Sequence, residues 1–211
     1  LEAFRKSGIS RAVMVGQITP THLFRLRLDR LALSILGRLK ERNAETIFGA
    51  VGEELRGVGV ELMPASLFME HTMPEPGVLT ARGPTDEEKA DIELGLKVAK
   101  TTSGLDIGQT VVIKRGTILA VEAFEGTDAA ILRAGKLGGS GSVVVKVAKQ
   151  GHDMRFDIPV IGEHTLKSLR RAGATALAVE ARRTILLDRE VIVRGADRQG
   201  LCIVAAEFNR G

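Results

Sequence analysis

The sequence has 211 residues, of which 44% are hydrophobic and 27% are charged, and its formal net charge is +4 at pH 7. A chain of this kind can bury a core without disulfides, and it contains no apolar run long enough to cross a bilayer. Tryptophan and tyrosine are absent and the basic residues are dispersed, which argues against nucleic-acid binding. A small phosphorylated ligand explains the mild positive charge better. The single cysteine, Cys202, excludes an internal disulfide, fits a reducing compartment, and is interpreted as a small buried hydrophobe.

The first 62 residues show the pattern of an α/β unit. We predict a short buried strand over residues 11–15, a loop over 16–20, two helices, and a strand over 60–62. Asn43 is placed to cap the second helix. The apolar faces of the helices are marked by Leu28, Leu31, Ile35, Leu36 and Leu39 in the first and by Ile47, Val51 and Leu55 in the second. Strands that alternate with helices predict a parallel sheet, so residues 1–66 are assigned to a partial Rossmann-like N-terminal domain.

A stretch rich in proline and glycine follows. Between residues 63 and 84 there are too many helix and strand breakers for a regular element. We therefore assign residues 67–84 to a linker and residues 85–211 to a C-terminal α/β domain that binds the substrate and carries catalysis.

The second half begins at a clear helix start. Thr85 followed by Glu88 has the spacing of a capping box, and the helix is expected to run to about residue 102. Further along, Asp188 is expected to cap a helix. The remaining predicted elements are a hairpin of strands 109–114 and 117–122, a helix opening at Thr127, a strand over 142–147, a helix over 165–171, and strands over 176–179, 184–187 and 201–205.

Polar side chains concentrate where the predicted strands of the C-terminal domain end. The first group holds Asp106 and Gln109, and the second spans residues 122–128. In the second group a strand passes into a helix, and Gly126 lets the backbone approach a ligand closely. Backbone amides at that helix start can hold phosphate. The alternative is that Thr127 and Asp128 only cap the helix.

A third polar group spans residues 146–159. Lys146, Lys149 and Arg155 can neutralise a pyrophosphate, and Arg155 can do so with a planar bidentate fork. Asp157 lies just before an apolar run, where a carboxylate can hold Mg²⁺ or activate water. The alternative is a solvated loop of mixed charge.

Several other chemistries lack candidates. The loop over residues 138–141 lacks the ending of a phosphate-binding P-loop, and the four histidines show no metal-ligand spacing. There is no nucleophile elbow and no cysteine paired with a histidine. What remains is attack by water, assisted by carboxylates, cations and a metal ion.

Several ordered motifs resemble the UDP-2,3-diacylglucosamine pyrophosphatase family, which some Gram-negative bacteria use in place of the metallophosphoesterase type. The resemblance covers essentially the whole chain. The motifs are AVMVGQITP at residues 12–20, LDIGQ at 105–109, LAVEA at 119–123, EGTDA at 125–129, KVAK at 146–149, DMRFDIP at 153–159 and LDRE at 187–190.

The resemblance implies two dissimilar α/β domains with a lipid substrate between them. It implies hydrolysis of UDP-2,3-diacylglucosamine to UMP and 2,3-diacylglucosamine 1-phosphate (lipid X) in lipid A biosynthesis, with Mg²⁺ assistance. It also implies a cytoplasmic protein at the periphery of the inner membrane, and a homodimer that exchanges elements between its subunits. The family begins with a Gly-rich strand-and-helix unit that is absent before Leu1, so we expect either preceding residues or a fragment.

The polar groups and the resemblance together give the candidate site residues. Asp157 falls on the family's catalytic aspartate, and Glu122, Asp128 and Asp157 are the candidate metal ligands. The predicted substrate-binding residues are Asp106, Gln109, Glu125, Gly126, Thr127, Asp128, Lys146, Lys149 and Arg155. The acyl chains need an apolar cleft, for which the candidates are Leu67, Phe68, Met69 and Met73, although a core or interdomain contact explains these residues equally well. The rival hypothesis is a non-catalytic module that binds nucleotide sugars or lipids.

Overall fold

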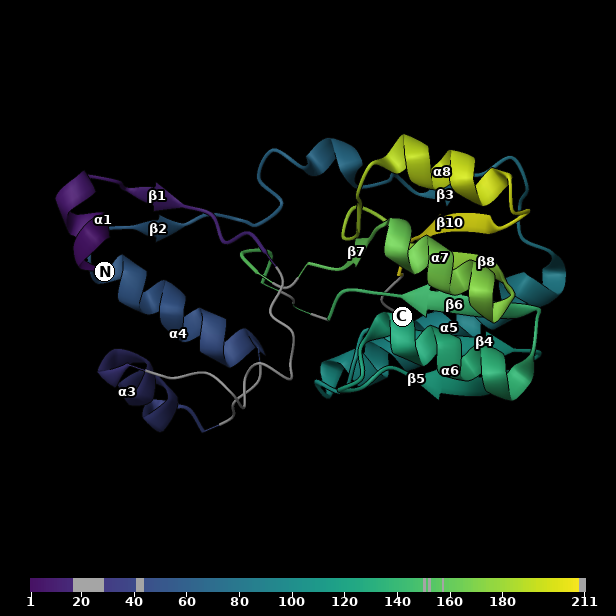
Figure 1. Ribbon diagram of the computed structural model, residues 1–211, viewed down its shortest axis with the longest axis horizontal. Coiled ribbons are helices and arrows are strands. Elements are labelled where there is room, and N and C mark those ends of the chain that lie inside the picture. The colour runs from purple at the N-terminus through teal and green to yellow at the C-terminus, as the bar shows by residue number, and fades with distance from the viewer. Residues whose placement is uncertain (17–28, 41–43, 150, 152, 157, 209–211) are drawn as a thin grey trace. The chain divides into compact units, whose positions relative to one another are not determined.

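The structure is a computed structural model that describes residues 1–16, 29–40, 44–149, 151, 153–156 and 158–208. The chain divides into two compact units. Unit 1 comprises Leu1–Leu67 and Asp153–Ile158, and unit 2 comprises Phe68–His152 and Pro159–Gly211. Each unit combines helices with strands (Figure 1), which confirms the predicted class of two dissimilar α/β domains.

Unit 1 is built around one small parallel strand pair. Among the described residues its elements are α1 (Glu2–Ser7), β1 (Arg11–Ala12), α3 (Arg30–Arg38), α4 (Ala44–Arg56) and β2 (Glu61–Leu62). Its core cluster includes Leu55, Val60 and Phe156. Phe156 is 3% exposed, and its ring centroid lies 5.8 Å from that of Phe48 in α4. Burial of this ring ties the segment Asp153–Ile158 to unit 1, although the segment is distant in sequence.

The structure corrects the first predicted strand. β1 ends at Ala12, because its partner β2 is only two residues long, and Val15 is 91% exposed. The first predicted helix is α3, and Asp29 caps it by accepting a hydrogen bond from the Ala32 amide at 2.8 Å. Leu28, Asn43 and residues 17–20 lie outside the described residues.

Unit 2 contains a six-stranded mixed sheet. The strand order is β3-β10-β8-β6-β4-β5, in which β6, β8 and β10 are parallel. A separate parallel pair joins β7 to β9. The elements are η1 (Glu70–Thr72), β3 (Gly77–Val78), α5 (Asp86–Gly104), β4 (Thr110–Lys114), β5 (Thr117–Val121), α6 (Thr127–Gly138), β6 (Ser142–Lys146), β7 (Val160–Ile161), α7 (Glu163–Ala172), β8 (Ala174–Glu180), β9 (Ile185–Leu186), α8 (Arg189–Asp197) and β10 (Cys202–Ala206).

Helices cover both faces of this sheet. Helices α6, α7 and α8 lie on one face (Figure 1), where Leu169 of α7 and Leu177 of β8 share a core cluster. Helix α5 packs on the other face, where Ile92 and Val145 belong to a second cluster. Cys202 is buried in the second cluster as predicted, and this burial raises the pKa of its thiol. The central strands are therefore buried on both faces, which explains their continuous apolar runs.

The predicted capping box at the start of α5 is confirmed. The Thr85 hydroxyl accepts a hydrogen bond from the Glu88 amide at 3.2 Å, and the Glu88 carboxylate accepts one from the Thr85 amide at 2.8 Å. The guanidinium of Arg82 donates to both Glu88 oxygens at 2.7 and 2.9 Å. Burial alone raises the pKa of Glu88, but the hydrogen bonds from Arg82 and Thr85 outweigh it and lower that pKa to about 2.

Two local predictions in unit 2 are wrong. The breaker-rich stretch contains a regular element, because β3 pairs antiparallel with β10 and Val78 lies opposite Val204. The backbone groups of β3 form hydrogen bonds with those of β10, which would otherwise be an unpaired edge strand. Asp188 precedes α8 but makes no side-chain cap, and its backbone is left-handed with φ 55°. No helix in the described part of the chain is long and apolar enough to span a membrane.

Candidate functional site

One edge of the six-stranded sheet gathers most of the predicted site residues. Strands β5, β6 and β8 share one direction, because β4 lies between β5 and β6 and is antiparallel to both. Their carboxyl ends therefore meet the amino end of β4 at one edge, which we call the carboxyl edge. Glu122 follows β5 there, Lys146 ends β6 and Gln109 precedes β4. Ligands of α/β sheets commonly bind at this kind of edge.

A chain of hydrogen bonds joins three predicted residues at the carboxyl edge. The Lys146 ammonium donates to the Thr127 hydroxyl at 2.6 Å, and this hydroxyl donates to Glu122 Oε1 at 2.9 Å. Lys146 is only 8% exposed, so its charge is held away from bulk water. Helix α6 has no side-chain cap at its amino end, so the alternative that Thr127 and Asp128 cap the helix is wrong.

Two carboxylate oxygens at this edge lack hydrogen-bond partners. Within the part of the chain that the structure describes, Glu122 Oε2 and Asp128 Oδ1 are buried and unpartnered. Buried acceptors without a donor are costly, which is typical of groups that receive a ligand or ion. Glu122 precedes the turn that leads into α6, and Asp128 lies in the first turn of that helix, next to Thr127, which donates to Glu122.

These two carboxylates fit a small magnesium donor set. No group of three or more His, Cys, Asp or Glu residues among the described residues can hold a metal ion. Magnesium in phosphate-binding sites, however, is commonly held by one or two carboxylates, with phosphate oxygens and water completing its shell. Glu122 and Asp128 match that smaller set through their unpartnered oxygens.

The first and third predicted groups also meet at the carboxyl edge. Lys149 Nζ lies 2.7 Å from Asp106 Oδ1, although 43 residues separate them. Asp106 has a left-handed backbone with φ 56°, an uncommon conformation outside glycine. The Gln109 carbonyl accepts the Val147 amide at 3.0 Å, which extends β6 towards Lys149. The side chains of Lys149 and Asp106 are 21% and 34% exposed, so a ligand can reach this pair from solvent.

Glu125 and Gly126 shape the turn before α6. The Glu125 carboxylate accepts the Ala123 amide at 3.1 Å and pairs with Arg133, and the hydrogen bond from Arg133 is the main reason that the pKa of Glu125 is lowered. Gly126 has φ 84°, a conformation that side-chain-bearing residues rarely adopt. In the structure Glu125 therefore stabilises the turn rather than joining the hydrogen-bond chain of Lys146, Thr127 and Glu122.

The structure does not place Arg155 and Asp157 relative to the carboxyl edge. Arg155 belongs to unit 1, where its fork is engaged by Asp153 at distances of 2.6 to 3.0 Å. This hydrogen-bonded pairing raises the pKa of Arg155. Asp157 lies outside the described residues.

Sequence reasoning missed a buried ion pair at the same edge. Lys100 of α5 and Glu180 at the end of β8 are 7% and 6% exposed, and Lys100 Nζ lies 2.7 Å from both Glu180 oxygens. Lys100 Nζ also lies 5.3 Å from the centroid of the Phe208 ring. The available signal was a charged residue directly after the apolar run of a buried strand, as in the case of Lys146.

Gly108 supports the carboxyl edge by a close backbone approach. A Cβ at this position would lie 2.1 Å from the Glu122 carbonyl oxygen, and a backbone atom cannot move aside as a flexible side chain does. We expect Gly108→Ala to lower the free energy of unfolding by about 1–3 kcal/mol and to displace Glu122. Urea unfolding checks this, with Gly104→Ala as the control, because a Cβ at Gly104 meets open space. Equal stability of the two variants would contradict the expectation.

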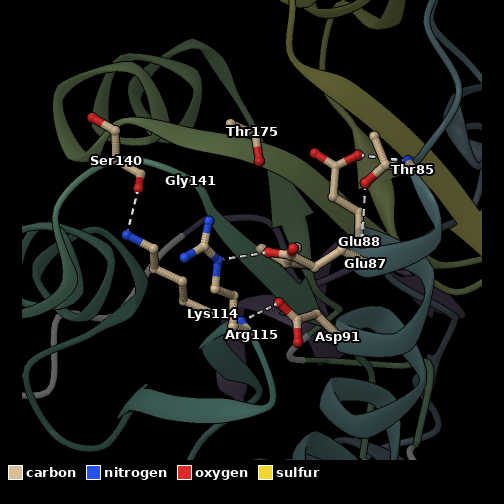
Figure 2. Close-up of a pocket in the computed structure, with 10 residues that line it drawn as sticks. Thr85, Glu87, Glu88, Asp91, Lys114, Arg115, Ser140, Gly141 and Thr175 are labelled. Carbon is tan, nitrogen blue, oxygen red and sulfur yellow. Dashed lines mark hydrogen bonds and ion pairs between the residues drawn. The ribbon is translucent and has the colours of Figure 1, made fainter.

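The opposite edge of the sheet holds a polar pocket of about 240 Å³ (Figure 2). Its charged groups hold local structure. Asp91 accepts the Arg115 and Gly116 amides at 2.8 and 2.7 Å, and Lys114 donates to the Ser140 carbonyl at 2.7 Å. These bonds fix the hairpin of β4 and β5 and the loop before β6, so we assign the pocket a structural role.

A larger groove of about 880 Å³ runs along α8. Its apolar lining includes Met69, Leu187 and Val191, and Arg189 and Arg194 add positive charge. Met69 is thus one of the predicted cleft residues that lines a cavity. Phe68 is 79% exposed.

Comparison with known family models also divides the chain into two domains close to the first boundary between the units, although Asp153–Ile158 of unit 1 falls within the C-terminal model. Residues 1–72 match the family model of the LpxI N-terminal domain, and residues 75–204 match that of the LpxI C-terminal domain. The chain is also 32% identical over 218 residues to the UDP-2,3-diacylglucosamine pyrophosphatase LpxI of Caulobacter vibrioides, a match that covers 98% of this chain and 78% of that protein. With both domain models matched in order and a relative of this identity along nearly its whole length, the chain belongs to the LpxI family.

Proposed function

We propose that this protein hydrolyses the pyrophosphate of UDP-2,3-diacylglucosamine to UMP and 2,3-diacylglucosamine 1-phosphate, a step of lipid A biosynthesis. The name of the Caulobacter relative supports the substrate and the reaction class. The observation that carries the proposal is the carboxyl edge, where the cations Lys146 and Lys149 lie at the same edge as the unpartnered oxygens of Glu122 and Asp128. Cations and a carboxylate pair for a metal are the groups that pyrophosphate cleavage needs.

Each group has a distinct role in the proposed mechanism. Lys146 and Lys149 bind the phosphates and stabilise the negative charge that develops on them. Glu122 and Asp128 would hold Mg²⁺, which would neutralise phosphate charge and polarise the phosphorus–oxygen bonds. Asp157 orients or deprotonates the attacking water. The Thr127 hydroxyl accepts from Lys146 and donates to Glu122, and so fixes the spacing of the cation and the carboxylate.

The groove along α8 is our candidate for an acyl chain of the substrate. Its apolar residues Met69, Leu187 and Val191 suit hydrocarbon, and the latter two are about half exposed without a ligand. Because the substrate is a lipid, we propose that the protein contacts the inner membrane from the cytoplasmic side. We also propose that it assembles as a homodimer.

The test is UMP release by the purified chain. We expect release from UDP-2,3-diacylglucosamine in the presence of Mg²⁺, at least about tenfold less release after chelation with EDTA, and much less from UDP-N-acetylglucosamine. The last substrate lacks the acyl chains whose binding energy would contribute to catalysis. Absence of UMP under every condition would reject the enzyme and favour a non-catalytic binding module. Equal release from both substrates would reject the lipid specificity.

A further inference from the structure

We propose that the buried Lys100–Glu180 ion pair is a positioning device for Lys149, and hence for the phosphate contacts of the substrate. The inference rests on the proposed function, because it assigns Lys149 to a phosphate. It assigns Lys100 and Glu180 a positioning role and no contact with the reacting atoms, because their charged groups bind each other and the backbone of Ala148.

The ion pair holds both backbone polar groups of one residue, Ala148. Glu180 Oε2 accepts the Ala148 amide at 2.8 Å, and Lys100 Nζ donates to the Ala148 carbonyl at 2.8 Å. Arg183 Nε lies 3.8 Å from Glu180 Oε1, a much weaker contact than the 2.7 Å from Lys100. The backbone of Ala148 is therefore hydrogen-bonded to one side chain from β8 and one from α5.

These hydrogen bonds to Ala148 lie just beyond the last residue of β6, where regular strand pairing ends. Lys146 is the last residue of β6 and is paired with Thr110 and Val179 on the neighbouring strands. Beyond it, the Val147 amide bonds to the Gln109 carbonyl, and Ala148 depends on the ion pair. Lys149 comes next, and its ammonium reaches Asp106 at 2.7 Å. Ordering Ala148 thus sets the direction in which the Lys149 side chain leaves the backbone.

A buried ion pair by itself adds little stability to a fold. Removing two charges from water cancels much of their attraction, and apolar residues of similar volume often stabilise a core as well. The value of this pair lies in its hydrogen bonds to Ala148, which apolar residues cannot make. A displacement of about 1 Å in a contacting group can lower a rate by roughly 100-fold.

The experiment measures kcat/KM for UMP release and the Tm of each variant. We expect Glu180→Gln to lower kcat/KM by about tenfold to 100-fold. Glu88→Gln is the control, because it breaks another ion pair, Arg82–Glu88 at the opposite edge, whose side chains are 34% and 10% exposed. This control is expected to lose Tm and to keep kcat/KM.

A double-mutant cycle with Lys149→Ala separates positioning from general support. If Glu180 acts through Lys149, Glu180→Gln lowers kcat/KM by no more than about twofold further in the Lys149→Ala background. Multiplicative losses would overturn the inference while leaving the hydrolase intact. An unimpaired Lys149→Ala variant would overturn it too. Failure of the unmodified chain to release UMP would instead reject the proposed function, and the inference with it.

The double variant Lys100→Met/Glu180→Gln covers the case in which Glu180→Gln does not fold. It leaves no uncompensated buried charge, so its Tm is expected to recover. The Ala148 carbonyl still lacks its donor, so kcat/KM is expected to stay low. Recovery of both quantities together would show that the pair only stabilises the fold and would overturn the inference.

Discussion

Replacing Asp157 with alanine is expected to lower kcat for UMP release by about 100-fold to 10,000-fold, which is the usual contribution of a positioned acid or base. Asp157 matches the catalytic aspartate implied by the family resemblance. Its neighbour Phe156 is anchored in the core of unit 1, and Arg155 is tied to Asp153. Because these anchors do not depend on Asp157, the substitution is expected to leave Tm nearly unchanged.

Two further variants sharpen this test. Asp157→Asn keeps the shape and removes the negative charge, so a similar loss of kcat would assign the effect to the charge. Asp86→Ala is the control, because Asp86 is a solvent-exposed carboxylate at the start of α5 and pairs only with Lys89 among the contacts described. If Asp157→Ala retained more than about a tenth of the activity, water activation by Asp157 would be rejected.

Replacing Lys146 with methionine is expected to lower kcat/KM by about 100-fold to 1,000-fold, which is typical of losing one preorganised donor to developing charge. Lys146 is 8% exposed at the end of β6, so its charge acts in a medium less polar than water. Methionine preserves most of the side-chain volume, and Thr127 keeps its acceptor Glu122. The variant is therefore expected to fold.

Lys114→Met is the matched control for Lys146→Met. Lys114 ends the neighbouring strand β4 at the opposite edge, where it holds the Gly138 and Ser140 carbonyls. Its loss is expected to lower Tm and to leave kcat/KM unchanged. Equal activity of the two variants would reject the assignment of Lys146 to the phosphates.

The candidate site was only partly predictable from the sequence. Lys146, Lys149 and Asp106 stand out because they lie at or near the ends of apolar strands. Their pairing was not predictable, since the bond between Lys149 and Asp106 depends on the antiparallel insertion of β4 between β5 and β6. The unpartnered oxygen of Glu122 likewise appears only when its surroundings are packed.

The elements that could be predicted from the sequence are those whose signals are local. The capping box at Thr85, the hairpin of β4 and β5, and the buried strands of unit 2 follow from side-chain hydrogen bonds within a few residues and from hydrophobic periodicity. The ordered motifs, together with the composition, also indicated the family and the class of ligand.

The long-range arrangement became apparent only in the folded chain. Burial of Phe156 places the segment Asp153–Ile158 in unit 1. Gly77–Val78 forms a strand because it pairs with β10. Lys100 likewise pairs with Glu180 across 80 residues. In each case the stabilising partner lies far away in sequence, so no local pattern encodes it and the contact exists only after the chain has packed.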